Sequence, residues 1–77
     1  MYSNDVENSD LRKARASIAE ELDAVSWYEK RIESAKDPEL AKILAHNRDE
    51  EKEHAAMLVE WLRKNDKTQD EAFEKHD

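Results

Sequence analysis

The segment from Arg48 to Ala55 carries a glutamate and a histidine three residues apart, Glu51 and His54. In a helix this spacing brings both side chains to one face, within about 60° of each other. Glu-x-x-His pairs on facing helices are the ligands with which di-iron and di-manganese helical bundles hold their metals. The pair therefore predicts a metal site, although so short a pattern also arises by chance in a chain rich in glutamate.

The apolar pattern around the pair favours the metal. Positions that step by three and four residues are apolar at both ends and polar in the middle: Leu40, Leu44, Asn47, Glu51, His54, Leu58 and Trp61. Polar side chains in the middle of a core cost free energy unless each finds a partner, and a metal ion is such a partner. The alternative is a polar cluster that fixes the pairing register of a coiled coil.

A second stripe of the same kind precedes the first. Its positions are Leu11, Ala14, Ile18, Glu21, Val25, Tyr28, Ile32 and Ala35. Glu21 lies in the middle of this stripe, and no cation occupies the adjacent stripe positions to neutralise it. We interpret Glu21 as a third ligand; the alternative is a salt bridge to a Lys or Arg elsewhere.

The turn between the two helices sets their relative position. Asp37 suits the N-cap and Pro38 the first position of the second helix, and so short a connection predicts an antiparallel hairpin. Glu21 lies about sixteen residues before Asp37, and Glu51 and His54 lie about fourteen and seventeen after it, so a rise of 1.5 Å per residue places all three at one level.

The chain divides into three segments. Residues 1–8 are polar and aperiodic, which predicts a flexible tail ahead of an N-cap at Ser9 or Asp10. Residues 9–65 form the helical hairpin. Residues 66–77 form a short C-terminal helix that Thr68 and Glu71 open as a capping box, with Phe73 as its one large apolar anchor for docking on a neighbour.

Composition limits the fold and the partners. With 77 residues, no Cys, 38% hydrophobic and 43% charged residues, the chain is at most one all-α domain whose core is marginal without association. The formal charge of −7 argues against nucleic acid and favours a cation. No apolar run is long enough for a membrane span and no signal pattern opens the chain, so we expect a cytoplasmic protein.

One hairpin supplies half of a di-metal site. Two copies related by a two-fold axis would supply two lone glutamates and two Glu-x-x-His pairs, with both metals at the interface of a four-helix bundle. Oxygen and imidazole ligands without sulfur suit iron or manganese, with zinc as a competitor.

Longer motifs also resemble the encapsulated ferritin family, over roughly residues 11–65. The matching runs are SIAEELDAVSWY at 17–28, DPEL at 37–40, ILAHNRDEEKEHAAM at 43–57 and EWLR at 60–63. The resemblance implies a two-helix ferritin-like protomer, ferroxidase centres formed between two chains and a homo-oligomeric ring of five dimers, a decamer. It also implies iron storage as cargo inside an encapsulin shell.

Several site roles follow from the resemblance alone. The family's metal ligands fall on Glu21, Glu51 and His54, its tyrosine next to the centre on Tyr28, and its neighbouring tryptophan on Trp27. The family also has acidic residues along the path by which metal reaches the centre, and these match Glu20 and Asp23. At the position of Asp23 the family more usually has glutamate. No hydrophobic shell-targeting peptide follows Asp77, so we expect a truncated chain or a relative that works without a shell.

The function expected from residues and resemblance together is ferroxidase chemistry. Two ferrous ions would bind among paired Glu21, Glu51 and His54 and lose electrons to dioxygen or peroxide. The alternatives are a non-catalytic helical assembly protein and a module that binds manganese or zinc.

Overall fold

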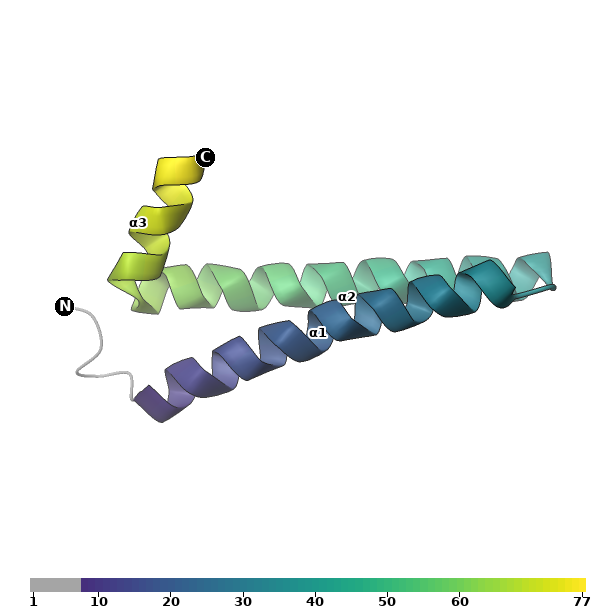
Figure 1. Cartoon of the computed structure of the whole chain (residues 1–77), viewed down its shortest axis with the longest axis horizontal. Helices are drawn as coiled ribbons and strands as arrows, with labels where there is room; N and C mark the ends of the chain where they lie inside the picture. The colour runs from purple at the N-terminus through teal and green to yellow at the C-terminus, as the bar shows by residue number, and fades with distance from the viewer. Residues whose placement is uncertain (1–7) are drawn as a thin grey trace.

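The computed structural model describes residues 8–77 as three helices: α1 (Asn8–Ser34), α2 (Pro38–Asn65) and α3 (Lys67–His76). α1 and α2 run antiparallel as a hairpin, and α3 turns steeply away from the end of α2 (Figure 1). The all-α hairpin with a short C-terminal helix is therefore confirmed. Of the predicted N-terminal tail, residues 1–7 lie outside the described residues.

The start of α1 was placed too late by sequence reasoning. Asn8, Ser9 and Asp10 are already helical, so neither Ser9 nor Asp10 is the N-cap. Asp10 lies instead in the first turn, where its charge complements the partial positive charge of the helix N-terminus. Its carboxylate also pairs with Lys13 at 3.5 Å, one turn along the helix.

The turn that aligns the hairpin is built as predicted. Asp37 has an extended backbone and its side chain accepts a hydrogen bond from the Leu40 backbone N–H at 3.1 Å. Pro38 occupies the first turn of α2, where its missing N–H costs nothing. Only three residues separate the end of α1 at Ser34 from the start of α2 at Pro38. So short a connection fixes which residues of α1 lie opposite which residues of α2.

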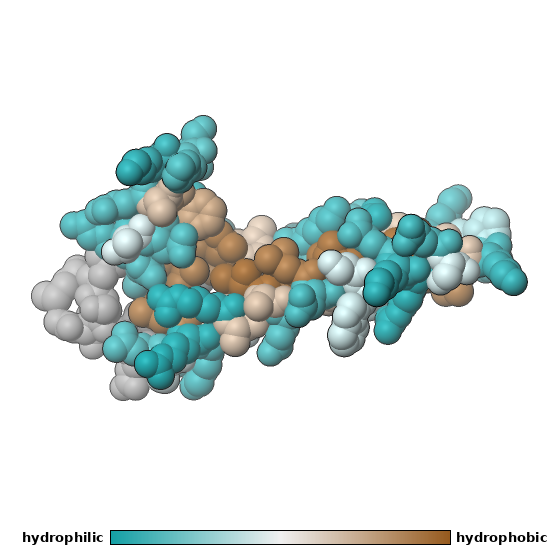
Figure 2. Space-filling view, in the orientation of Figure 1, coloured by the Kyte–Doolittle hydropathy of each residue, from teal (hydrophilic) through white to brown (hydrophobic). Residues whose placement is uncertain are grey.

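The core of a single chain is small. Among the described residues only four hydrophobic side chains are buried, namely Leu11, Ala14, Ala55 and Leu62. Five large hydrophobic side chains are exposed: Leu22, Trp27, Leu40, Ile43 and Met57. Figure 2 shows apolar side chains along the junction of the two long helices, bordered by hydrophilic ones. So little burial leaves a lone hairpin only marginally stable.

The predicted inward stripe of α2 is only partly correct. Leu44, Glu51 and Leu58 are half-buried, but Leu40 and His54 are exposed, and the buried positions are Ala55 and Leu62. The face of α2 that contacts α1 is therefore centred nearer Ala55 and Leu62 than the stripe read in the sequence, although Asn47 and Trp61 of that stripe are also half-buried. The apolar stripe of α2 is wider than the surface that α1 covers. Part of this stripe is therefore exposed to solvent in a single chain.

The last helix is capped by a residue that sequence reasoning passed over. The side chain of Asp66 accepts a hydrogen bond from the Gln69 backbone N–H at 3.1 Å, so Asp66 is the N-cap and the proposed capping box of Thr68 and Glu71 is wrong. Asp66 also accepts a hydrogen bond from the Arg15 guanidinium of α1 at 2.9 Å. One carboxylate therefore joins the start of α1 to the start of α3.

α3 is held against α2 mainly by one arginine. Arg63 of α2 donates to Asp70 of α3 at 2.7 Å, and its guanidinium lies 5.0 Å from the centre of the Phe73 ring. Phe73 thus packs against Arg63 of α2 in its own chain, whereas the sequence had suggested that this helix docks on a neighbour. Among residues 8–77, no helix combines the length and the apolar character that crossing a bilayer requires.

Asp66 should stabilise the fold in a pH-dependent way. The pKa of Asp66 lies below its ordinary value of 3.8, chiefly because the Gln69 N–H favours the carboxylate and also because Arg15 does. A depressed pKa in the folded state gives stability that is present above pH 3.8 and is lost as the pH falls through the folded value. Asp66→Ala should therefore lower the free energy of unfolding at pH 7 by about 1–2 kcal/mol.

Circular dichroism melts of Asp66→Ala, at one protein concentration, check this expectation. Asp66→Asn is the matched control, because it keeps an acceptor at the N-cap and loses only the charge. We expect the asparagine variant to lose less stability, and the alanine effect to shrink as the pH falls below 3.8. Equal melting temperatures for Asp66→Ala and the unchanged chain at pH 7 would contradict the assignment.

Candidate metal centre

Three side chains that could hold a metal ion, from the two long helices, meet midway along the hairpin. Single ligand atoms of Glu21, Glu51 and His54 all lie within 4.8 Å of one another. His54 Nδ1 is 3.5 Å from Glu21 Oε2 and 3.6 Å from Glu51 Oε2. The three residues therefore lie at one level of the hairpin, as the register of the Asp37–Pro38 turn requires.

The cluster has an acceptor without a partner. Glu21 Oε2 is buried and receives no hydrogen bond from the described residues. A buried carboxylate oxygen in this state costs free energy, whereas a cation or a proton would satisfy it. Oxygen and neutral imidazole ligands also suit iron, manganese or zinc. The donor set and the unsatisfied oxygen together fit a divalent metal.

The two carboxyl groups act on each other. The neighbouring carboxyl of Glu51 raises the pKa of Glu21 above its ordinary value, burial of the Glu21 side chain adds to this rise, and His54 opposes it. Two carboxyl groups at close range make the ionised form of Glu21 less favourable in the metal-free site. A divalent cation between them would offset this repulsion.

The cluster is open on one side. The side chains of Glu21 and Glu51 are 26% and 23% exposed, while that of His54 is 51% exposed. Three side chains are fewer than the four to six ligands that these metals take. One chain therefore offers a partial coordination sphere, with free positions on the exposed side of the hairpin.

The other predicted site residues lie outside this cluster. Glu20, Asp23 and Trp27 are exposed, and Trp27 retains 62% of its accessible surface. Tyr28 is half-buried on the hairpin stripe, with the Arg31 guanidinium 5.7 Å from its ring centre. Met57, one helical turn beyond His54, is also exposed and was not among the site residues predicted from the sequence.

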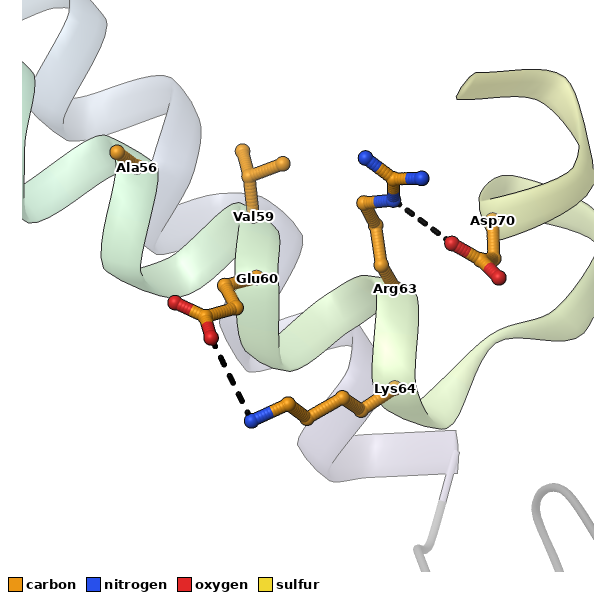
Figure 3. A pocket seen from close by; sticks show the side chains of 6 residues that line it. All are labelled: Ala56, Val59, Glu60, Arg63, Lys64 and Asp70. Carbon is orange, nitrogen blue, oxygen red and sulfur yellow. Dashed lines mark hydrogen bonds and ion pairs between the residues drawn. The ribbon is translucent and has the colours of Figure 1, made fainter. Parts of the chain in front are cut away.

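A separate hollow lies in the angle between α2 and α3. It is lined by Ala56, Val59, Glu60, Arg63, Lys64 and Asp70 (Figure 3). Its charged groups already pair with each other: Arg63 with Asp70 at 2.7 Å and Lys64 with Glu60 at 3.5 Å. This hollow therefore lacks the free acidic and imidazole ligands that make the Glu21 cluster a candidate metal centre.

An all-helical hairpin with a Glu-Glu-His cluster between its helices defines a ferritin-like protein. The chain belongs to the EncFtn-like family, whose sequence profile matches residues 3–76. It is 60% identical over 60 residues to an encapsulated ferritin-like protein of Rhodospirillum rubrum, an alignment that covers 78% of this chain and 43% of that protein. The suspected encapsulated ferritin family is thereby confirmed.

One further sequence relative and one solved structure agree with this family assignment. An encapsulin nanocompartment cargo protein of Myxococcus xanthus is 38% identical over 69 residues, covering 84% of this chain and 53% of that protein. A crystal structure of a Nitrosomonas europaea protein superposes with a TM-score of 0.86 at 51% identity, covering 91% of this chain and 77% of the other. The chain spans about half the length of the curated relatives it matches.

Proposed function

We propose that this chain is a ferroxidase, which oxidises ferrous to ferric iron at a di-iron centre built from Glu21, Glu51 and His54 of two protomers. The observation that carries the proposal is the meeting of these three ligand atoms within 4.8 Å around a buried, unpartnered Glu21 oxygen. Membership of a ferritin-like family supports iron as the substrate, and manganese or zinc would compete for the same ligands.

The chemistry follows from the donors. The carboxylates of Glu21 and Glu51 would hold iron through oxygen and balance the positive charge that rises when ferrous iron becomes ferric. His54 would supply a nitrogen ligand on the exposed side. The oxidant would be dioxygen or peroxide. Tyr28 is half-buried on the same stripe, seven residues along α1 from Glu21, and its role beside the centre is proposed from the family resemblance alone.

The site needs a second copy of the chain. One protomer provides one lone glutamate and one Glu-x-x-His pair, which is half of the ligand set of a four-helix di-iron bundle. The small core and the exposed Leu40 and Ile43 favour burial against another hairpin. We therefore propose a homodimer as the building block, and, from the family resemblance, a ring of five dimers.

The partner outside the oligomer would be an encapsulin shell. One relative is named as an encapsulin nanocompartment cargo protein and another as an encapsulated ferritin-like protein. We propose that this chain likewise works in the cytoplasm inside an encapsulin compartment, where ferric product would be stored.

Aerobic addition of ferrous iron tests the activity. We expect oxidation faster than the protein-free background, with more iron oxidised than the two ions that each dimer binds, followed by the absorbance of the ferric product. Bovine albumin at equal mass serves as the control for adventitious binding. Oxidation no faster than in that control would overturn the proposal.

Glu20 and Asp23, the acidic residues expected on the path of the metal, should affect the rate of iron oxidation but not the amount of iron bound. Glu20 and Asp23 are exposed and lie outside the ligand cluster, so Glu20→Ala or Asp23→Ala should slow iron delivery several-fold while leaving the bound iron unchanged. Initial rates and metal content by mass spectrometry measure the two quantities. Loss of bound metal equal to that of Glu51→Ala would place these residues among the ligands.

The main alternative is a helical assembly or metal-binding module without catalysis. It would use the same cluster to hold manganese or zinc, or to specify pairing between hairpins. Binding of two zinc ions per dimer together with background rates of iron oxidation would favour that function.

A further inference from the structure

A hollow lies between the two long helices, on the side of the hairpin that carries the candidate metal centre. It has a volume of about 340 Å³, and we call it the inter-helix hollow; it is lined by Asp10, Lys13, Ala14, Ser17, Leu58 and Trp61. Leu58 follows His54 by four residues on α2, so both side chains lie on one face of the helix, one turn apart. Ser17 precedes Glu21 by four residues on α1 in the same way. The inter-helix hollow is therefore continuous with the surface at which the proposed site needs a second chain.

The walls of the inter-helix hollow favour an aliphatic occupant. Ala14 is buried, and Leu58 and Trp61 are half-buried, so the hollow has apolar walls. The charged groups at its edge, Asp10 and Lys13, already pair with each other at 3.5 Å. An aliphatic side chain that enters this space loses contact with water and displaces no unpaired charge.

Ile43 is an aliphatic side chain on the same face of α2, toward the turn of the hairpin. In a single chain it is 52% exposed. It precedes His54 by eleven residues, close to three whole helical turns, so both side chains leave α2 in nearly the same direction. We take the level midway between Glu51 and His54 as that of the centre. Ile43 lies about 14 Å from this level toward the turn, and Trp61 lies about 13 Å from it toward the open end.

Two-fold symmetry through the centre would bring Ile43 and the inter-helix hollow together. An axis perpendicular to the helices, lying between two facing hairpins, sets α2 of one chain antiparallel to α2 of the other and exchanges the two sides of the centre. Each Ile43 then meets the inter-helix hollow of the other chain, and both contacts form at once. An axis parallel to the helices would instead put both turns at the same end. Ile43 and the other chain's Trp61 would then lie about 27 Å apart along the helices.

We propose that Ile43 of one protomer fills the inter-helix hollow of the other, so that the two hairpins face each other with their turns at opposite ends. This inference rests on the two-chain site of the proposed function, to which it adds the orientation of the chains and the contact that sets it. The occupant is a second copy of this chain, because the hollow adjoins a ligand set that one chain leaves half complete. Ile43 also lies at the distance from the centre that the symmetry requires.

Disulfide cross-linking tests the orientation, because the sequence contains no cysteine. Ile43→Cys/Trp61→Cys should form covalent dimers under mild oxidation, seen on a gel without reductant, and peptide mapping should find the bond between positions 43 and 61. Within one chain these positions lie about 27 Å apart on α2, beyond the roughly 7 Å between Cα atoms that a disulfide spans, so such a bond joins two chains.

Ile43→Cys/Glu60→Cys is the matched control for the cross-link. Glu60 lies at nearly the same level as Trp61 but on another face of α2. We expect at least about fivefold more covalent dimer for the pair with Trp61→Cys than for this control.

A second variant keeps every residue of the inter-helix hollow. Ile43→Asp would place a carboxylate against apolar walls, so it should raise the dissociation constant of the dimer at least about tenfold at equal helix content, measured by light scattering. Lys42→Asp puts the same carboxylate one position away on a different face of α2, and should change the dissociation constant less than about threefold.

The outcomes separate this inference from the function on which it rests, because cross-linking and association are measured without iron. Covalent dimer no more abundant than in the Glu60 control, in protein that light scattering shows to be associated, would overturn the orientation and leave the ferroxidase function intact. Equal dissociation constants for the two aspartate variants would do the same. Iron oxidation at background rate, together with the disulfide between positions 43 and 61, would overturn the ferroxidase function and support the contact.

Discussion

Glu51→Ala and His54→Ala should each reduce iron oxidation to the protein-free background while leaving the helices intact. Each substitution removes one ligand from both halves of a two-fold site, so the loss should exceed the roughly 10–100-fold effect of losing a mere supporting hydrogen bond. Glu21→Ala should be as severe, because it removes the carboxylate that α1 contributes. Initial rates with ferrous iron in air and far-ultraviolet circular dichroism measure activity and helix content.

Two matched variants make this prediction specific. Glu50→Ala removes the same charge from the position next to Glu51, but the Glu50 carboxylate pairs with exposed His46 at 3.3 Å and lies outside the cluster, so activity should persist. Glu21→Gln keeps the size of the side chain and removes its charge. Wild-type rates in all three ligand variants would show that the proposed site is wrong.

Glu21→Gln also has an expected effect on stability that is opposite in sign to its effect on activity. The pKa of Glu21 is raised in the folded chain, so ionised Glu21 is less favourable there than in the unfolded chain. The associated stability is present below the ordinary pKa and is lost as the pH rises through the raised value. Replacing the carboxylate by a neutral amide should therefore leave the metal-free chain at least as stable at pH 7, while iron oxidation is lost.

Metal should drive association, which is the second large effect we expect. A site whose ligands come from two chains binds metal only when they are associated, so metal favours the oligomer by mass action. At a metal concentration 100 times the dissociation constant, the bound state gains about 2.7 kcal/mol. Chelator at neutral pH should therefore populate smaller species, and ferrous or another divalent ion should restore the larger assembly.

Lowering the pH should dissociate the oligomer as chelator does, because protons also displace the metal. Metal binding requires ionised Glu21, and because its pKa is raised, protons compete with metal from a higher pH than for an ordinary glutamate. Native mass spectrometry or light scattering, at protein concentrations near dissociation, measures the distribution of sizes. His54→Ala serves as the control, since its distribution should not respond to metal. If chelator and metal gave the same distribution for the unchanged chain, apolar contacts alone would account for assembly.

The level at which the ligands meet could be predicted because local rules determine it. Asp37 and Pro38 fix where α1 ends and α2 begins, and a constant rise per residue then carries Glu21, Glu51 and His54 to one height. Helical spacing also places Glu51 and His54 on one face. Neither step depends on contacts between distant residues.

The face that each helix buries was harder to predict. The stripe of α2 combines positions that contact α1, such as Leu44, with positions that remain exposed, such as Leu40. A sequence with one broad apolar stripe does not tell which part of it meets the partner helix of the same chain.

The cap of α3 could have been read from local sequence. Asp66 and Thr68 are both favourable N-cap residues, and Asp66 caps α3 by accepting a hydrogen bond from the Gln69 backbone N–H, three residues along the chain. What local sequence does not contain is the second hydrogen bond to Asp66, from the Arg15 guanidinium 51 residues away.

The most direct test of the di-iron centre is a crystal structure of the assembled protein loaded with ferrous iron without oxygen, with anomalous data collected at the iron absorption edge. The proposal predicts two iron peaks per dimer, both at this cluster and held by Glu21, Glu51 and His54 side chains of the two protomers. Iron bound within a single protomer, or at the exposed acidic residues and not at this cluster, would contradict it.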